Sequence, residues 1–512
     1  MYGEEVTMFK IVLSNLTMMI NTFTFSKGLI IFLVYYLTII STVTSNTETE
    51  DENVIIEKII TIFGPSLEDL LAEDDDMEFN YKLKDDNEEI LTKQQIGHIM
   101  DSIQLGVKYE MEKRTQQVPD SFPDDFQDIS TKIFNNWRDI NNNKIQNFSY
   151  STYAPSTFHY LRHLFGIDAN DYVNSFCKSP LRELSNPGAS SSIFYLTPND
   201  RFIMKTVQQT EYICLLGLLH RYTTYLNDNQ ESLLPKFSGF YNFQCKSTDI
   251  KLVSMNNLLP SDIKIHQKFD LKGSTLGRIA SVNERKKKSP TYKDLDFNYE
   301  FHRKGIFLKP DTRLALLKTI ENDCEILKEF NIMDYSILIG VHYIDSSLQA
   351  DENTSTTEAL RKAATDRWES LMDDSVEDKS IQAETWTLSD KNHASLSGSI
   401  PSKSVYGEKL LLFVGIIDIL QTFRIIKKLE YRLKTFKLKV TPGATETAES
   451  ISVQPPVFYA SRFLKYMTDT VFRPMLSDQE LEKLSKQPVP MKLSSKRGCA
   501  PSSSMYIPDC FK

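Results

Sequence analysis

One carboxylate within a strongly apolar stretch constrains this chain more than any other feature. Asp418 lies in Gly415-Ile416-Ile417-Asp418-Ile419-Leu420, and the run 410–420 has the composition of a buried strand. Burying a lone carboxylate is costly unless a metal ion or a cation satisfies it. We therefore expect Asp418 to bind a metal ion. The alternative is a structural aspartate at a sheet edge or a helix cap.

Two further blocks add charged residues of a related kind. Asp334 follows an apolar helical pattern and precedes the strand-like Ile337-Leu338-Ile339, the placement of a loop carboxylate that reaches a substrate hydroxyl. Asp270, Lys272 and Arg278 cluster around a glycine turn, where the two cations can neutralise phosphate oxygens. Together these residues predict phosphoryl transfer. The protein-kinase signatures H-R-D, D-F-G, A-P-E and G-x-G-x-x-G are absent from the sequence.

A predicted hairpin over 192–207 offers groups that could bind a nucleotide. The turn before it, Gly188-Ala189-Ser190-Ser191-Ser192, could bring backbone N–H groups at Ser190 and Ser192 near phosphates, although any Gly-Ser turn looks the same. Lys205 ends the hairpin between apolar neighbours, so it points either into a cleft, held by Glu211, or into solvent.

Composition limits the partners. The chain has 512 residues and a formal net charge of −9, which argues against a nucleic-acid partner. Its six cysteines show no metal-binding spacing, so we expect reduced thiols.

Hydrophobic spacing predicts a strand over 252–259 and helices over 95–112, 158–165, 208–225, 311–330 (capped by Asp311) and 458–471.

From about residue 95 to residue 473 the chain resembles the phosphatidylinositol phosphate kinase family. The blocks that carry the resemblance are FIMKTVQ, MNNLLP, KFDLKGST, YKDLDF, IMDYSILIG, GIIDILQTF and FYASRFLKYM. The resemblance implies an α+β, two-lobed lipid kinase fold that is distantly related to protein kinases. It would have an antiparallel N-lobe sheet and an α/β C-lobe.

The resemblance also implies a use of ATP and Mg²⁺ and a role for each charged residue. Lys205 would bind ATP phosphates, Asp334 would be the catalytic-loop aspartate, and Asp418 the magnesium ligand. Lys272 would contact the transferring phosphate and Arg278 the lipid headgroup. The adenine-binding hinge would consist of Met255, Asn256, Asn257 and Leu258.

Within the family, the activation loop (about 419–455) sorts substrates. Glu430, after Lys427 and Lys428, resembles the type I enzymes, which make phosphatidylinositol 4,5-bisphosphate from phosphatidylinositol 4-phosphate. A basic stripe that includes Lys434 has the composition of a segment that meets anionic lipid, as has the run 285–288. Two alternatives stay open: a type II-like phosphatidylinositol 5-phosphate 4-kinase, and a weakly active phosphoinositide-binding scaffold. Ser191 leaves the scaffold open because it replaces a glycine of the family's G-A-S-G-S turn.

The expected organisation follows from these assignments. The N-lobe would span 93–260 and the C-lobe 261–476, with a disordered insert at about 346–408, and 477–512 would be a flexible tail. Residues 46–92 are acidic and expected to be disordered. The apolar run 28–43 fits a signal peptide, a membrane anchor or an incorrectly assigned first exon. We expect no membrane span, because a kinase needs cytosolic ATP; the expected location is cytoplasmic, peripheral on the inner leaflet of the plasma membrane. A homodimer is compatible with the family.

Overall fold

The computed structural model of the protein describes residues 93–114, 122–138, 145–184, 192–245, 248–259, 263–344, 355–372, 398–423, 431 and 450–487. Several predicted features fall outside these ranges: the apolar run 28–43, the acidic segment 46–92, and the site residues Ser190, Lys427, Lys428, Glu430 and Lys434. Among the described helices, none is both long and apolar enough to cross a bilayer.

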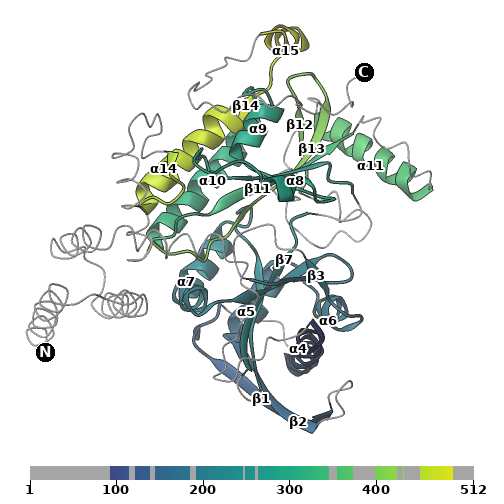
Figure 1. Cartoon of the computed structure of the whole chain (residues 1–512), viewed down its shortest axis with the longest axis vertical. Coiled ribbons are helices and arrows are strands. Elements are labelled where there is room, and N and C mark those ends of the chain that lie inside the picture. Colours follow the sequence, from purple (N-terminus) through teal and green to yellow (C-terminus); the bar gives the residue numbers. More distant parts are fainter. Residues whose placement is uncertain are drawn as a thin grey trace, which may run out of the picture.

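An entirely antiparallel sheet forms the lower half of the molecule in Figure 1. Neighbouring strands are, in order, β1 (Ile129–Arg138), β2 (Ile145–Tyr153), β6 (Phe237–Cys245), β7 (Thr248–Asn256), β5 (Phe202–Val207), β4 (Phe194–Leu196) and β3 (Arg182–Leu184). Strands β4 and β5 form the hairpin predicted over 192–207. The strand predicted over 252–259 is present as β7 but ends at Asn256.

Four helices pack against this sheet. They are α4 (Lys93–Arg114), α5 (Pro155–Leu164), α6 (Ala169–Cys177) and α7 (Gln209–Asp228). Helix α4 packs against α6 and β2 through Ile103, Val107 and Met111, which are buried as the helical spacing of the sequence predicts. Helix α5 packs against β6 and α7.

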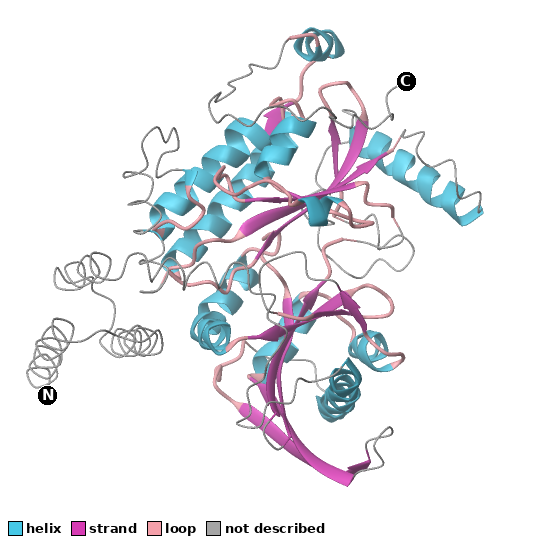
Figure 2. Ribbon diagram, in the orientation of Figure 1, coloured by secondary structure: helices cyan, strands magenta, loops and turns pink. Residues whose placement is uncertain are grey.

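The upper half contains a second, mixed sheet, which Figure 2 shows apart from the first. Its strand order is β14 (Phe472–Pro474), β10 (Ile306–Leu308), β12 (Ile400–Lys403), β13 (Lys409–Ile417), β11 (Ser336–Tyr343), β8 (Gln267–Leu271) and β9 (Thr291–Tyr292). The pairs β10–β14 and β8–β9 are parallel and the others antiparallel. Two sheets with associated helices confirm the predicted α+β class.

Helices α10 (Pro310–Glu329) and α14 (Pro456–Tyr466) pack together beside this sheet. A π-helical turn (Met467–Val471) continues α14. The prediction that Asp311 caps α10 is wrong: Lys309 is the cap residue, and Pro310 starts the helix with its fixed φ. The short helices α8 (Val282–Arg285) and α9 (Asp294–Glu300) follow strand β8.

Two segments that were expected to lack structure contain regular elements. Within the insert at 346–408, helix α11 (Ser355–Met372) places Trp368 against an apolar cluster beside β13, and β12 joins the sheet. Within the tail, α15 (Asp478–Ser485) buries Leu481. The polar composition of both segments concealed the few apolar side chains that anchor them.

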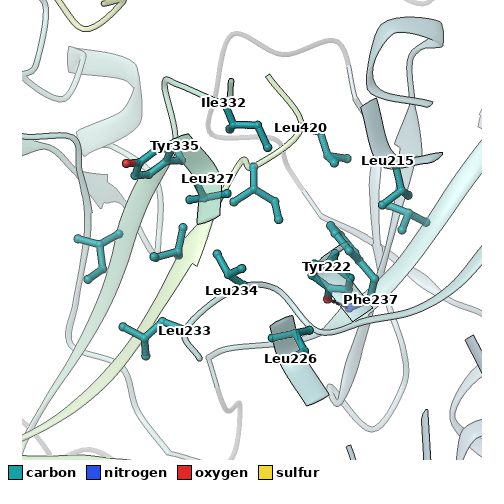
Figure 3. Close-up of a cluster of buried hydrophobic side chains, with 14 of the residues drawn as sticks. Leu215, Tyr222, Leu226, Leu233, Leu234, Phe237, Leu327, Ile332, Tyr335 and Leu420 are labelled. Atoms are coloured by element: carbon teal, nitrogen blue, oxygen red, sulfur yellow. Dashed lines mark hydrogen bonds between the residues drawn. The ribbon is translucent and has the colours of Figure 1, made fainter. Parts of the chain in front are cut away.

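The two halves share one hydrophobic core. Tyr222 and Leu226 of α7 lie in the same buried cluster as Leu327 of α10, and Figure 3 shows Leu234 between them. A buried carboxylate, Asp323 of α10, reinforces this junction.

Three donors from the lower half reach the Asp323 carboxylate: the Tyr225 hydroxyl (2.7 Å), the Ser232 hydroxyl (2.7 Å) and the backbone N–H of Leu233 (2.8 Å). The Leu233 carbonyl in turn accepts a hydrogen bond from the backbone N–H of Ile416 in β13 (2.8 Å). The connection before β6 is therefore bonded to both α10 and β13.

Candidate active site

Three strand ends of the upper sheet meet at one edge. In the register of the sheet, Leu271 at the end of β8 pairs with Ile337, and Ser336 at the start of β11 pairs with Ile417 at the end of β13. Lys272 therefore follows β8 at the same edge where Asp334 precedes β11 and Asp418 follows β13. The predicted catalytic residues, far apart in sequence, are brought together by strand order.

Backbone hydrogen bonds tie the two aspartate loops to each other. The N–H of Met333 donates to the carbonyl of Gln421 (3.1 Å), and the N–H of Phe423 donates to the carbonyl of Asn331 (2.9 Å). The backbone of each aspartate lies in the left-handed region, with φ of 65° at Asp334 and 63° at Asp418. Such backbone is rare outside glycine, is tolerated best by Asp and Asn, and is common at functional sites.

Asp418 does not lie inside a strand, which corrects the sequence prediction. Strand β13 ends at Ile417, and the Asp418 side chain is exposed to solvent. Among the described residues, no hydrogen bond or ion pair engages its carboxylate. Although the residue is exposed, the protein around the carboxylate replaces part of its water and so raises the pKa of Asp418, and the positive charges of Lys205 and Lys272 oppose that rise. A solvent-accessible, unpaired carboxylate is free to take a cation.

Lys272 and Asp334 form an ion pair in which Nζ lies 2.9 Å from Oδ1. Burial by itself lowers the pKa of Lys272, but Asp334 and Asp270 outweigh it, so the pKa stands above its ordinary value. The lysine therefore stays protonated at neutral pH. A fixed cation at this position can stabilise the negative charge of a transferring phosphoryl group.

Lys205 comes from the other sheet and is buried. Its ammonium donates to Glu211 Oε1 (2.8 Å), while Glu211 Oε2 accepts from the backbone N–H of Gln208 at the start of α7 (3.0 Å). One carboxylate thus both caps the helix and holds the lysine. The predicted pairing of Lys205 with Glu211 is present, and the positive charge of Lys205 lowers the pKa of Asp418 in the other half.

The predicted hinge residues lie where β7 leaves the lower sheet. Asn256 Oδ1 accepts from the Lys236 N–H (2.9 Å), and Asn257 Nδ2 donates to the carbonyls of Asp200 (2.8 Å) and Leu259 (2.7 Å). Leu258 lies against Gly415 of β13, where an added Cβ would approach it to 3.0 Å. Met255 is partly buried against the core. The asparagine side chains therefore fix the path of the chain between the two lobes. Ser192, the other predicted nucleotide-binding residue that the structure describes, is buried at the start of the hairpin.

Arg278 is buried between two carboxylates. Its Nε donates to Asp294 Oδ2 (2.6 Å), and its Nη2 donates to Asp270 Oδ1 (2.7 Å). Burial lowers the pKa of the guanidinium, and Asp270 and Asp294 together raise it above its ordinary value. Most of this side chain is committed to internal bonds. Binding of a lipid headgroup by Arg278 stays a prediction.

The sequence analysis missed Asp294, which organises the loop after β8. Its Oδ1 accepts from the backbone N–H groups of Lys272 (2.9 Å) and Gly273 (2.7 Å), while Oδ2 binds Arg278. Gly273 has a φ of 69°, so this turn needs a residue without a side chain. Asp294 stands in the YKDLDF block, but no spacing rule distinguishes it from the neighbouring acids.

Arg462 of α14 was also missed. Its Nη2 donates to the carbonyls of Ser452 (3.2 Å) and Lys272 (3.4 Å). Arg462 therefore ties helix α14 to the loop that carries Lys272.

The side chains at this site fit Mg²⁺ bound together with phosphate better than a metal ion bound by protein side chains alone. Within the described residues, no group of three or more His, Cys, Asp or Glu side chains could hold a metal ion. Mg²⁺ is commonly bound by one or two carboxylates with phosphate oxygens and water completing the octahedron. Asp418 offers such a carboxylate beside two lysines suited to phosphate.

Comparison with known proteins decides the family. Residues 175–470 match the model of the family described as "Phosphatidylinositol-4-phosphate 5-Kinase", and this match covers more than half of the chain. The chain belongs to this family. The matched range contains Lys205, Lys272, Asp334 and Asp418, so the site described above lies within the family's shared region.

Curated relatives are members of the type-1 branch. Human phosphatidylinositol 4-phosphate 5-kinase type-1 beta is 45% identical over 326 residues, which are 64% of this chain and 59% of the human protein. The rat type-1 alpha protein is 45% identical over 329 residues, 64% of this chain and 58% of the rat one. A type-1 protein of Drosophila melanogaster is 40% identical over 432 residues, 74% of this chain and 53% of its own. The chain thus spans less than two thirds of the length of these relatives.

Proposed function

We propose that this protein transfers the γ-phosphoryl group of ATP to the inositol 5-hydroxyl of phosphatidylinositol 4-phosphate, making phosphatidylinositol 4,5-bisphosphate. The observation that carries the proposal is the common sheet edge. It holds the Lys272–Asp334 pair (2.9 Å) and the unpaired Asp418 together, opposite Lys205. Membership of the family and the printed names of the type-1 relatives support the substrate.

Each residue has a role that its surroundings allow. Lys205, fixed by Glu211, would bind the α- and β-phosphates, and Lys272 would neutralise the transferring group. Asp334 would orient the attacking hydroxyl rather than act as a strong base, because a carboxylate in an ion pair is a weak one. Phosphoryl transfer has a loose transition state that requires little base catalysis, so positioning suffices.

Asp418 would hold Mg²⁺, which would offset the negative charge of the phosphate groups. The left-handed backbone of Asp418 directs the chain away from β13 immediately after the strand, so its carboxylate lies at the sheet edge rather than within the sheet. Met255, Asn256, Asn257 and Leu258 would form the adenine-binding segment, since they connect the two lobes next to Gly415. Backbone N–H groups near Ser190 and Ser192 would contact the phosphates.

The residues that we propose to select the lipid substrate are identified from the sequence alone. Glu430 would select the type I reaction, and Lys427, Lys428 and Lys434 would contact the anionic membrane that carries the substrate. The protein would then act as a peripheral protein on the cytoplasmic leaflet of the plasma membrane.

A homodimer is part of the same proposal. Among the described strands, β1 forms an edge of its sheet, and its Ile129 and Ile133 side chains are 52% and 60% exposed. An edge strand with exposed apolar side chains favours pairing with a second copy.

The test incubates full-length protein and labelled ATP with phosphatidylcholine vesicles that contain phosphatidylinositol 4-phosphate or, separately, the 5-phosphate. The lipid products are deacylated and resolved by ion-exchange chromatography. We expect label on the 4-phosphate substrate, at the 5-position. The Glu430→Ala variant should gain activity on the 5-phosphate, and Glu325→Ala, an exposed site on α10, is the matched control.

The alternatives predict other products. Label mainly on the 5-phosphate substrate would identify a type II-like 4-kinase. Folded protein that binds these vesicles and transfers no label to either lipid would be the scaffold.

A further inference from the structure

Three carboxylates of the segment after Lys272 all point inward. Glu284, Asp294 and Asp296 are 7%, 1% and 7% exposed. Each is paired: Glu284 with Lys287 (2.6 Å), Asp294 with Arg278 (2.6 Å), and Asp296 with Arg285. The acidic groups of residues 273–296 are therefore hidden from an approaching surface.

The exposed side chains of residues 279–288 include aliphatic and cationic ones, with the small polar Ser281 and Asn283 between them. Ile279 and Val282 are 54% and 68% exposed. Arg285, Lys286 and Lys288 are exposed beside them. We name these five residues the 279–288 face. Although the whole chain carries a net charge of −9, this face is positive, because Lys286 and Lys288 add to Arg285, whose charge is partly offset by Asp296.

Backbone bonds hold the face in a fixed shape. The N–H of Ala280 donates to Asp296 (2.8 Å), the N–H of Thr291 donates to Glu284 (2.8 Å), and the N–H of Leu295 donates to the Arg278 carbonyl (2.9 Å). The exposed aliphatic side chains thus stand on a rigid support, so presenting them to a partner costs little conformational entropy.

The face is also joined to the candidate active site. Asp294 binds the backbone of Lys272 and Gly273 and the guanidinium of Arg278, whose neighbour is Ile279. An enzyme that phosphorylates a lipid headgroup must meet the bilayer next to the groups that transfer phosphate. The 279–288 face has that position.

We propose that the 279–288 face docks on an anionic lipid surface. Ile279 and Val282 enter the boundary between headgroups and acyl chains while Arg285, Lys286 and Lys288 remain at the headgroups. Aliphatic side chains surrounded by long cationic ones match this boundary, which is apolar below and negative above. The proposal rests on the proposed function for the choice of a membrane as partner, and it adds a docking element outside the activation loop.

The test measures co-sedimentation of full-length protein with phosphatidylcholine vesicles, with and without phosphatidylserine. The apolar variant is Ile279→Ser/Val282→Ser, with Leu314→Ser, an equally exposed leucine on α10, as its control. The cationic variant is Lys286→Gln/Lys288→Gln, with Lys483→Gln/Lys486→Gln on α15 as its control. All these positions are at the surface, and matching thermal unfolding midpoints verify folding.

We expect the wild-type protein to bind phosphatidylserine vesicles more tightly than neutral ones. The cationic variant should lose about tenfold or more of that affinity, because each juxtamembrane lysine contributes measurably to binding. The apolar variant should lose a similar factor, and this loss should persist at high salt, where charge effects are screened. Unchanged binding of both variants would overturn the proposal, as would equal losses in the control variants.

A second measurement separates insertion from surface adsorption. Ile279→Trp should show a blue shift of the added tryptophan emission on phosphatidylserine vesicles, whereas Leu314→Trp should not. No shift at Ile279 would overturn insertion. Binding of the 279–288 face to an acidic protein instead would leave both vesicle measurements at the level of the controls.

A third measurement distinguishes this proposal from the proposed function. Phosphorylation of a short-chain, soluble phosphatidylinositol 4-phosphate should be the same in wild type and variants, while phosphorylation in vesicles should fall with binding. Vesicle binding that depends on the face in a protein without kinase activity would support the docking surface and refute the function.

Discussion

At the scale of single residues, the site depends on carboxylates that differ in their surroundings. Asp294 and Glu211 are buried and fully engaged, so they position cations and backbone. Asp418 is exposed and has no ion-pair partner among the described residues, and Asp334 holds one lysine. This division separates residues that hold the site in shape from those that remain available to substrates.

Replacement of Asp418 by Asn should separate activity from stability. The raised pKa means that the ionised carboxylate is disfavoured in the folded protein. The contribution of Asp418 to stability is thus present below its unfolded pKa and is lost as the pH rises through the folded value. Asp418→Asn should therefore melt at the same temperature as wild type or higher at neutral pH.

The rate of phosphoryl transfer should fall about a thousandfold in the same variant, since a bound metal contributes several kcal/mol of charge stabilisation in the transition state. Calorimetry and a label-transfer assay measure the two effects. An active Asp418→Asn variant would contradict the metal role.

Replacement of Asp294 by Ala should destabilise the fold by about 3 kcal/mol, because it leaves the buried Arg278 without one of its two charge partners. Urea unfolding measures this cost. Asp294→Asn keeps an acceptor for the Lys272 and Gly273 N–H groups, so it should recover part of the stability. If Ala and Asn variants are equally stable, Asp294 does not position this loop.

At the scale of elements, strand order assembles the site. Strands β8, β11 and β13 lie side by side, and their ends at one edge carry Lys272, Asp334 and Asp418. Asp323 bonds α10 to the connection before β6, which in turn reaches β13. The hydrogen bonds of one buried carboxylate thus add to the shared hydrophobic core in holding the two lobes together.

The stability of this junction should depend on pH through Asp323. Burial raises its pKa to about 6. A raised carboxylate pKa contributes stability that is present below the unfolded value and is lost as the pH rises through about 6. The wild type should therefore lose on the order of 2 kcal/mol relative to Asp323→Asn between pH 4 and pH 7. Parallel pH profiles of the two unfolding free energies would contradict this assignment.

Much of the site could be predicted from sequence because its residues stand out against apolar neighbours. Lys205, Asp334 and Asp418 each interrupt a hydrophobic pattern, and a buried charge needs a reason. Asp294 and Arg462 could not be found in this way, since their partners are backbone groups that only the tertiary fold brings near. Helices α11 and α15 were missed because helices in polar segments resemble loops in composition.

At the scale of the whole molecule, the two lobes should respond to nucleotide as one unit. Saturation with Mg²⁺ and ATP at a hundred times the dissociation constant should stabilise the folded protein by about 2.7 kcal/mol. Lys205→Met should abolish this gain and also destabilise the protein by about 3 kcal/mol, because Glu211 is left buried without its partner.

The double variant Lys205→Met/Glu211→Gln is the matched control. It removes the unpaired charge and keeps an acceptor for the Gln208 N–H, so it should regain stability without regaining the nucleotide effect. Recovery of the nucleotide effect in the double variant would show that Lys205 does not bind ATP.

The most direct test of the account is label transfer to phosphatidylinositol 4-phosphate by full-length wild-type protein and by Asp334→Asn. We predict transfer by wild type and a loss of about a hundredfold or more in the variant, the range expected for a group that orients a hydroxyl. The stabilisation of the folded protein by Mg²⁺ and ATP should be unchanged in the variant, because we assign Asp334, the partner of Lys272, to the attacking hydroxyl and not to the nucleotide. Full transfer by Asp334→Asn, or none by a folded wild type that binds Mg²⁺ and ATP, would contradict it.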